Sequence, residues 1–297
     1  MTHLIPYLVV KLSRRKMNNL KGKYGGKWGL VTGAASGIGK QLSIKLAKQD
    51  YNLILINKTT SDLNEMVSQL LIDFPNIKVE KLVIDFSDQN EKFEKLEKLV
   101  EELDVTVFFN NAGFSQVNDF VNFSWNQIMS EIQCNIVTNI KLTHIYMKKL
   151  IKSKKKSLIV FTSSMAHYLP IPWMILYPSC KAFITDFSIS SSIHAKKYNI
   201  DFTVIHPGPV DGTQFFSIAK LNPKSLVMRI TSLFSQSSES VADFIINGSG
   251  RFYSLDTSLL VCFLRLFMDL IGKDIIVSIF QLLIKIFHLD SSCLKKN

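Results

Sequence analysis

The chain has 297 residues, of which 47% are hydrophobic and 20% charged, so it can bury a sizeable core and is not a disordered protein. Its formal net charge is +11, but the basic residues gather near the N-terminus and in Lys152–Lys156 without a nucleic-acid-binding signature, and we expect no nucleic-acid partner. The four cysteines lie far apart and the six histidines lack metal-ligand spacing, which excludes a disulfide framework and a bound metal and favours a reducing compartment.

The first predicted element is a short apolar stretch, Leu4–Val10, which a cluster of basic residues follows. Seven residues that include Pro6 are too few to span a bilayer, for which about 20 are needed. The stretch also lacks the basic leader and the small-residue cleavage site of a signal peptide. We therefore interpret residues 1–23 as a segment that contacts a membrane surface, with its basic residues facing anionic lipid.

From residue 24 onward, short apolar runs alternate with amphipathic stretches of helical length. Strands that are apolar on both faces and alternate with helices predict a parallel sheet covered on both sides, with right-handed crossovers. Residues 24–254 are therefore expected to form one α/β domain with a doubly wound parallel sheet. The predicted strands are Trp28–Val31, Leu53–Ile56, Val79–Ile84, Val105–Phe109, Leu158–Phe161 and Phe202–Ile205. The predicted helices are Ile38–Lys48, Asp62–Ile72, Glu91–Glu101, Trp125–Ile151 and Ser179–Lys197.

Residues 255–297 differ from the domain because they are strongly apolar, yet charged residues recur at Arg265, Asp269 and Lys273. This four-residue spacing predicts an apolar helical extension whose charges lie on one face. The longest uncharged run, Ile275–Ile284, is about half a membrane span. Two interpretations stay open: the apolar face packs onto the domain or a second subunit, or it lies on a membrane surface.

Directly after the first predicted strand comes a turn rich in small residues, and a predicted helix follows it. Small residues let the backbone turn tightly and approach a pyrophosphate, which the N–H groups and the dipole of the helix N-terminus then bind. This position in an alternating β/α domain predicts a dinucleotide site. The residues assigned to it are Gly33, Ser36, Gly37, Ile38 and Gly39.

The ends of the next three strands supply further candidates. Asn57 and Lys58 stand where an acidic residue would select a 2′-hydroxyl, whereas a lysine can pair with a 2′-phosphate, which favours NADP(H) over NAD(H). Asp85, which precedes Phe86, can accept a hydrogen bond from the adenine amino group, and capping a helix N-terminus is the alternative. Three residues at the end of the fourth strand are expected to border the cofactor: Asn111, Ala112 and Gly113.

A tyrosine and a lysine four residues apart are the strongest catalytic candidates. Tyr177 and Lys181 share one face at the start of a predicted helix, and Ser164 ends the preceding strand. A phenol with a pKa of about 10 transfers a proton poorly at neutral pH unless its anion is stabilised, and a neighbouring ammonium provides that stabilisation. The spacing therefore predicts a proton-transfer pair.

Taken in this order, the motifs resemble the short-chain dehydrogenase/reductase family, and most of all its branch of 17β-hydroxysteroid dehydrogenases and very-long-chain 3-oxoacyl-CoA reductases. The resemblance rests on the TGAASGIG turn, on the NNAG sequence Asn110–Gly113 and on the block Ser163–Phe187, and it extends over about residues 24–213. It implies a Rossmann-like fold and a nicotinamide cofactor, and a homodimer is expected. This branch usually begins with a transmembrane helix, of which only Leu4–Val10 corresponds here.

The resemblance also implies roles for single residues. Tyr177 would protonate the carbonyl oxygen during reduction, Lys181 would lower the pKa of Tyr177 and bind the nicotinamide ribose, and Ser164 would hydrogen-bond the substrate carbonyl. Asn135 corresponds to the asparagine that holds a proton-relay water. The family's threonine after the sixth strand is displaced by one residue here. The residues implied to contact the nicotinamide from that loop are Pro207, Gly208, Val210 and Thr213.

We therefore expect an NADP(H)-dependent oxidoreductase that interconverts a ketone and a secondary alcohol on an apolar substrate, either a steroid or a 3-oxoacyl-CoA. The alternative is a cofactor-binding scaffold or sensor without turnover. An apolar lid over about residues 212–237 would cover the substrate. The resemblance implies the cytosolic face of the endoplasmic reticulum membrane, with a cytoplasmic location as the alternative, because Leu294 interrupts a C-terminal dilysine pattern.

Overall fold

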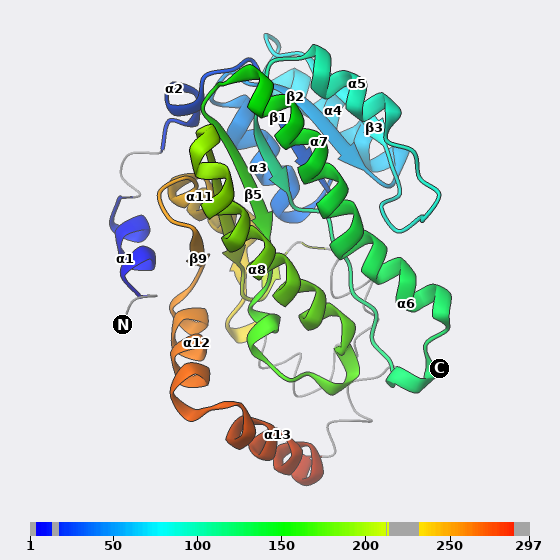
Figure 1. Ribbon diagram of the computed structural model, residues 1–297, viewed down its shortest axis with the longest axis vertical. Helices are drawn as coiled ribbons and strands as arrows, with labels where there is room; N and C mark the ends of the chain where they lie inside the picture. Colours follow the sequence, from blue (N-terminus) through cyan, green and yellow to red (C-terminus); the bar gives the residue numbers. More distant parts are fainter. Residues whose placement is uncertain (1–3, 14–17, 212, 214–231, 288–297) are drawn as a thin grey trace.

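The computed structural model describes residues 4–13, 18–211, 213 and 232–287. Seven strands in these ranges form one parallel sheet in the order β3-β2-β1-β4-β5-β6-β9 (Figure 1). The order reverses between β1 and β4, and α/β proteins bind ligands at the carboxyl ends of strands at such a switch point. The bounds are β1 Trp28–Thr32, β2 Asn52–Asn57, β3 Val79–Val83, β4 Val105–Asn110, β5 Ser157–Thr162, β6 Ile200–His206 and β9 Ser254–Asp256.

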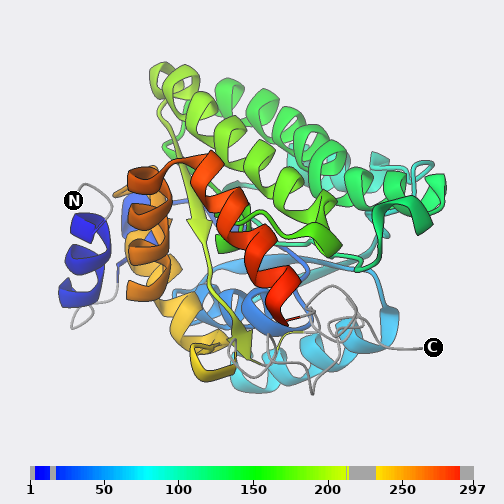
Figure 2. The ribbon, with the colours of Figure 1, turned by 90° about the horizontal axis from the view of Figure 1, so that it is seen from below.

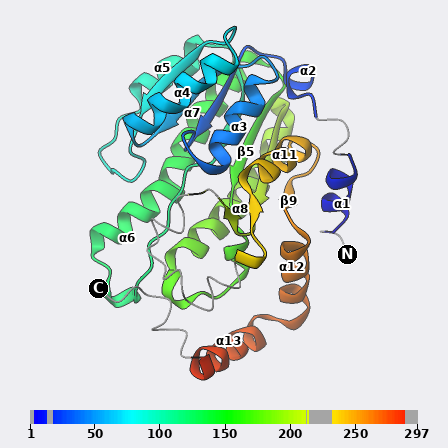
Figure 3. The same ribbon diagram turned by 180° about the vertical axis from the view of Figure 1, so that it is seen from behind.

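Helices cover both faces of this sheet (Figures 1 and 3). Because neighbouring residues of a strand point to opposite faces, Leu30 packs in one core and Val31 in the other. This is the doubly wound α/β fold that the sequence predicts. The core around Val31 is closed by α2 (Leu20–Tyr24), α3 (Gly37–Ala47), α4 (Thr60–Asp73) and α11 (Ser238–Gly248). The core around Leu30 is closed by α5 (Glu94–Glu102), α7 (Thr138–Ser153) and α8 (Leu176–Ala195).

All six predicted strands are present, and the structure adds β9 at the edge of the sheet beside β6. Its three residues are too few to show a periodic pattern, and they begin at the boundary predicted between the domain and the tail. The predicted helix Trp125–Ile151 is divided: α6 (Trp125–Ile132) and α7 are joined by a π-helical turn, Gln133–Val137. Such a turn inside a helix often marks a functional site.

Shorter elements connect these parts. A small parallel pair, β7 (Val210–Asp211) and β8 (Gln236–Ser237), brings together the two ends of the segment predicted as the substrate lid. Most of that predicted lid, about residues 212–237, lies outside the described residues. The 3-10 helices are Phe120–Asn122, Met165–Tyr168, Pro172–Met174 and Lys196–Tyr198.

The predicted apolar N-terminal stretch forms a helix, α1 (Leu4–Leu12), that packs against the domain on one side. Tyr7 stacks on Phe244 of α11 with the ring centroids 5.5 Å apart, and Val10 is fully buried. The opposite side leaves apolar side chains in contact with solvent, most of all Leu12, which is 78% exposed. The segment is therefore attached to the domain along one face and apolar along the other.

The C-terminal part consists of two helices where the charge spacing suggested a single one. Gly272, with a φ of +83°, separates α12 (Leu259–Ile271) from α13 (Lys273–Phe287). The face predicted to carry Arg265, Asp269 and Lys273 therefore stops at the end of α12. Seen from below, α13 runs from the end of α12 across the molecule (Figure 2).

The tail is held to the domain by a few contacts of α12. Val261 and Cys262 are buried, and Nη1 of Arg265 lies 3.5 Å from Oδ2 of Asp256 at the end of β9. Much of the rest is exposed and apolar, including Phe263 and Leu270. Within the described parts of the chain, no helix has both the length and the apolar character needed to cross a bilayer.

Candidate active site

A cavity of about 790 Å³ opens at the carboxyl ends of the central strands. The turn between β1 and α3, the ends of β2 to β6 and the start of α8 all contribute to its walls. Gly39 and Asn135, both assigned from sequence, do not line the cavity. The other assigned residues do: Gly33, Ser36, Gly37, Ile38, Asn57, Lys58, Asp85, Phe86, Asn111, Ala112, Gly113, Ser164, Tyr177, Lys181, Pro207, Gly208, Val210 and Thr213.

The turn between β1 and α3 depends on glycines for its shape. Gly33 and Gly37 have φ values of +63° and +51°, which residues with a Cβ rarely adopt. A Cβ on Gly39 would lie 2.0 Å from the carbonyl oxygen of Gly33, so only glycine lets α3 start this close to the turn. The start of α3 thus borders the cavity, and this glycine-rich turn at a helix N-terminus fits the pyrophosphate of a dinucleotide.

An ion pair connects the ends of β2 and β3. Nζ of Lys58 lies 2.8 Å from Oδ2 of Asp85, and the lysine side chain is 66% exposed. Burial alone would raise the pKa of Asp85, but hydrogen bonds from Lys58 and Ser87 outweigh burial and hold that pKa below its usual value. The carboxylate accepts from the backbone N–H of Ser87 at 2.9 Å, whereas α5 begins only at Glu94. Asp85 therefore stabilises a turn and does not cap a helix.

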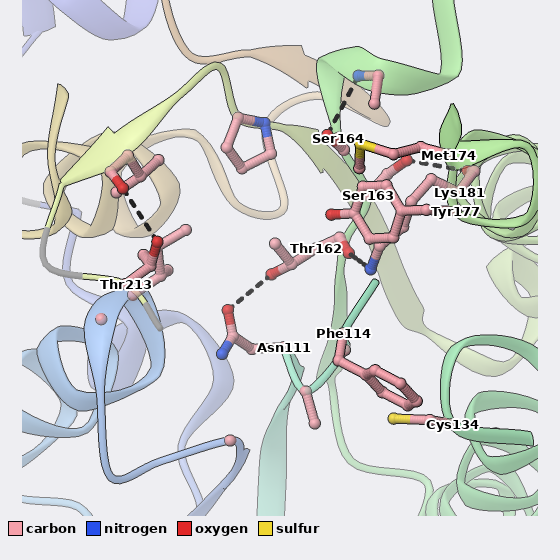
Figure 4. Close-up of a pocket in the computed structure, with 18 of the residues that line it drawn as sticks. Asn111, Phe114, Cys134, Thr162, Ser163, Ser164, Met174, Tyr177, Lys181 and Thr213 are labelled. Atoms are coloured by element: carbon pink, nitrogen blue, oxygen red, sulfur yellow. Dashed lines mark hydrogen bonds between the residues drawn. The ribbon is translucent and has the colours of Figure 1, made fainter. Parts of the chain in front are cut away.

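Hydrogen bonds between strand ends make the floor of the cavity. Oγ1 of Thr32 accepts from the backbone N–H groups of Asn111 and Ala112, both at 2.9 Å. Oγ1 of Thr162 donates to Oδ1 of Asn111 at 3.2 Å (Figure 4). The ends of β1, β4 and β5 are thus joined to one another, which fixes the position of the residues that follow each strand.

Tyr177 and Lys181 lie one helical turn apart at the start of α8, close to Ser164 at the end of β5 (Figure 4). Nζ of Lys181 is 5.5 Å from the centroid of the Tyr177 ring and donates to the carbonyl oxygen of Thr162 at 2.8 Å. The hydroxyl of Ser163 donates to the main-chain oxygen of Lys181 at 2.9 Å. The catalytic candidates from two elements are therefore held together by hydrogen bonds between β5 and α8.

Burial dominates the protonation of this pair. It raises the pKa of Tyr177 well above its ordinary value, although a hydrogen bond with Ser164 opposes the rise. It also lowers the pKa of Lys181 to about 8, against the effect of nearby Cys134, Cys180 and Glu131. The net shift of Tyr177 is thus opposite to the lowering expected from Lys181, because burial outweighs the other contributions. At neutral pH the phenol is protonated and the lysine is charged.

Asn135 lies in the π-helical turn and is fully buried. Its Nδ2 donates to the carbonyl oxygens of Phe114 at 2.8 Å and of Glu131 at 3.0 Å. Its Oδ1 has no hydrogen-bond partner among the described residues. A Cβ built on Gly113 would lie 2.7 Å from this Oδ1 and 3.0 Å from Nζ of Lys181, so the amide and the lysine share the space behind the cavity wall.

Apolar side chains complete the cavity at the end away from the Gly33 turn, and sequence analysis assigned none of them. The segment between β5 and α8 contributes Leu169, Ile171, Trp173 and Met174. Helix α13 contributes Phe280, Leu283 and Ile284, about 100 residues further along the chain. The amphipathic pattern of α13 was the available signal, but it does not say which structure the apolar face meets. These three residues therefore face the cavity, although Leu283 is also 37% exposed.

The fold and this cavity define a class, the α/β proteins that bind a dinucleotide at the carboxyl ends of their strands. The family model described as short chain dehydrogenase matches residues 27–222, and the chain belongs to that family. Members of the family are oxidoreductases that bind a nicotinamide cofactor. The family that the sequence motifs resemble is thereby confirmed.

Curated relatives lie in the branch that the sequence suggested. A very-long-chain 3-oxoacyl-CoA reductase of Aspergillus niger is 30% identical over 183 residues, which are 61% of this chain and 53% of the relative. The enzyme of that name from Podospora anserina is 32% identical over 184 residues, or 60% of this chain and 54% of the relative. The chain thus spans about half the length of the curated relatives that it matches.

Solved structures support the fold. A structure reported in a study of 7β-hydroxysteroid dehydrogenase stereoselectivity aligns with a TM-score of 0.78 and 21% identity, and covers 89% of this chain and 100% of that one. A short-chain dehydrogenase from Sphingobium yanoikuyae in complex with NADPH aligns with a TM-score of 0.71 and 20% identity, over 87% and 95%. At this identity the two structures show the shared architecture alone.

Proposed function

We propose that the protein is an NADP(H)-dependent oxidoreductase that interconverts a ketone and a secondary alcohol on an apolar substrate. One observation carries this proposal: Ser164, Tyr177 and Lys181 line the same cavity as the turn that begins at Gly33. The turn would hold the pyrophosphate of a dinucleotide, and the three side chains would border the nicotinamide. The apolar end of the cavity is then left for the substrate.

The bound cofactor supplies the hydride in reduction and accepts it in oxidation. The proton is handled by the chain itself. In reduction, the hydroxyl of Tyr177 donates its proton to the carbonyl oxygen, to which Ser164 also donates a hydrogen bond. The raised pKa of Tyr177 keeps that proton in place at neutral pH, and the ammonium of Lys181 stabilises the phenolate left behind. Oxidation of the alcohol uses the same groups in the opposite direction.

The preference for NADP(H) is supported by the end of β2. Asn57 there carries no charge that would repel a phosphate, and Lys58 is exposed at the cavity rim. The contact with Asp85 holds the lysine ammonium at the adenosine end of the site. A 2′-phosphate would accept a hydrogen bond from Lys58 at this position.

An apolar substrate is supported by the side chains from the β5–α8 segment and from α13 that form the far wall. The names of the curated relatives favour a long-chain 3-oxoacyl-CoA, and a steroid ketone is the alternative. A turnover screen with NADPH against both ketone classes tests the proposal, and we expect reduction of one class or both. If NADPH binds and no ketone is reduced, a cofactor-binding scaffold or sensor becomes the better description.

We also propose that the protein attaches to a membrane surface, on the cytosolic face of the endoplasmic reticulum as the branch resemblance suggests. Helix α12 contacts both α1 and α13, and all three helices carry exposed apolar residues. We propose that these residues together form the region that meets the membrane. The alternative occupant of this region is a second copy of the chain, which would give the expected homodimer. The exposed apolar residues are Ile5, Leu8, Val9 and Leu12 on α1, Leu259, Phe263, Phe267 and Leu270 on α12, and Ile275, Val277, Ile279, Leu282 and Leu283 on α13.

A further inference from the structure

One buried carboxyl group has no role in the chemistry described so far. Glu131, near the end of α6, is 0% exposed. Its Oε2 accepts a hydrogen bond from the backbone N–H of Gln116 at 3.0 Å, while its Oε1 has no partner among the described residues. Glutamate is almost never fully buried unless a positive charge or several donors accompany it, because removing a carboxylate from water is costly. The contacts with Gln116 satisfy it only in part, because they leave Oε1 without a partner among the described residues.

The surroundings of Glu131 belong to the catalytic site. It precedes Asn135 by one helical turn, and Nδ2 of Asn135 donates to its main-chain oxygen at 3.0 Å. Both α6 and the π-helical turn pack against α8, which carries Tyr177 and Lys181. Oδ1 of Asn135 and Nζ of Lys181 lie within 3.0 Å of one point above Gly113. Glu131 therefore lies one helical turn from an amide that borders Lys181, close enough for an electrostatic interaction with that lysine.

The charged and titratable groups around Glu131 come from two elements in the described part of the chain. Helix α8 contributes Lys181, Tyr177 and Cys180, and the π-helical turn contributes Cys134. Lys181 is the cation of this group. The loop that follows Gly113 contributes a backbone donor at Gln116, so no second cation there neutralises a charge on Glu131.

We propose that Glu131 is a positioning residue whose negative charge keeps Lys181 an ammonium, and thereby sets the upper end of the pH range in which Tyr177 can donate its proton. This inference rests on the proposed oxidoreductase function. It adds a residue that regulates how the activity of that site depends on pH. Glu131 touches neither the cavity nor the reacting atoms, and it acts through Lys181.

The direction of the effect follows from the protonation of the two groups. Burial raises the pKa of Glu131 to about 7, although the Gln116 contacts and Lys181 lower it. Burial lowers the pKa of Lys181 to about 8, and Glu131 opposes that change. Above pH about 7, Glu131 is ionised and favours the charged lysine; below that pH it takes up a proton and its influence disappears.

Replacement of Glu131 by glutamine isolates the charge. The amide oxygen of glutamine can still accept from Gln116, so the loop contact is kept while ionisation is lost. We expect E131Q to match the wild type at pH about 6, where Glu131 is already neutral. The basic limb of kcat/KM for ketone reduction should move to lower pH by about half a unit to one unit, which is about a three- to tenfold loss at pH above the limb.

Two further variants serve as controls for the activity profile. Glu65→Gln removes a carboxylate from the exposed face of α4, and its pH profile should be that of the wild type. Glu131→Asp keeps the negative charge, so the basic limb of its pH profile should lie close to that of the wild type and not at the lower pH expected for E131Q. A loss in E131Q by one constant factor at every pH would overturn the proposal, because it would show that Glu131 only supports the loop at Gln116, and it would leave the proposed function standing.

A second measurement works without turnover. The C=O stretch of a protonated carboxyl group, followed by infrared difference spectroscopy of the full chain, should titrate at pH about 7 in the wild type and be absent in E131Q. In Lys181→Met the same titration should move to higher pH, because Lys181 lowers the pKa of Glu131. An unchanged titration in Lys181→Met would refute the coupling. If no ketone is reduced by the wild type, the proposed function fails and this titration still decides the inference.

Discussion

The two ends of the cavity are built in different ways. At the nucleotide end, every wall comes from a short segment directly after a strand: the turn from Gly33, the pair Asn57 and Lys58, and Asp85 with Phe86. At the substrate end, the walls come from the β5–α8 segment and from α13, which are separated by about 100 residues. The cofactor end is therefore local in sequence, and the substrate end exists only once the tail has folded back onto the domain.

Between the two ends lies the catalytic group, which shares features of both. Tyr177 and Lys181 are four residues apart and readable as a pair, whereas Glu131 and Asn135 reach them only because α6 packs against α8. The comparison shows that short motifs encode the general chemistry of the site. The choice of substrate and the pH range of activity depend on which helices pack around those motifs. Four variants test this comparison, and they follow from the largest expected effect to the smallest.

Tyr177→Phe tests the catalytic group and should have the largest effect. It removes only the proton that is transferred, so kcat should fall by at least ~10²-fold, as for the loss of a general acid. The affinity for NADPH, measured by fluorescence titration, should stay close to that of the wild type, because the ring is kept. Tyr253→Phe, at a residue 57% exposed and away from the cavity, is the matched control and should be neutral. Turnover near the wild-type value in Tyr177→Phe would refute the mechanism.

The exposed apolar region of the tail is tested by flotation with anionic vesicles. Phe263→Glu combined with Leu270→Glu places two charges on the exposed side of α12, and we expect vesicle binding to weaken at least ~10-fold. Ile193→Glu, at an isoleucine of α8 that is as exposed as Leu270, should leave flotation unchanged. Absence of flotation for the wild type, together with a dimer that the double variant dissociates, would instead assign this region to a second copy of the chain.

Lys58→Glu tests the nucleotide end alone. The substitution places a second carboxylate beside Asp85, so affinity for NADPH should fall about tenfold while affinity for NADH is largely kept, because a 2′-hydroxyl is not repelled by a carboxylate. Lys98→Glu, on the exposed side of α5, controls for the change in net charge. A wild-type protein that prefers NADH would contradict the assignment of Lys58.

Leu283→Ala tests the substrate end and has the smallest expected effect. It shortens an apolar side chain in the cavity wall, and kcat/KM for a long-chain ketone should fall about fivefold, the equivalent of about 1 kcal/mol of lost apolar contact. The affinity for NADPH should not change. Leu282→Ala, next to it in sequence but outside the cavity, is the control. Equal effects of the two substitutions would show that α13 does not bind the substrate.

The sequence by itself determined the α/β class, the six central strands and the family. These follow from patterns that repeat over short distances: apolar runs that bury both faces of a strand, glycines that a tight turn requires, and a tyrosine and lysine one helical turn apart. The residues assigned on this basis meet in one cavity, with Gly39 and Asn135 just behind its wall. Position after a strand was sufficient for the residues of the turn and of the next three strand ends, because the carboxyl ends of parallel strands converge at one edge of the sheet. Asn135 and the residues after β6 were assigned through the family resemblance.

Only the tertiary structure decided the rest. It placed β9 beside β6, broke the predicted tail helix at Gly272, and turned Phe280, Leu283 and Ile284 toward the cavity. It also reversed the expected pKa shift of Tyr177 and buried Glu131 in the helix that packs against α8. None of these features has a local signal in the sequence, because burial and electrostatic coupling depend on which distant segments pack together. An amphipathic pattern shows that one face of a helix is apolar, but it does not show what covers that face.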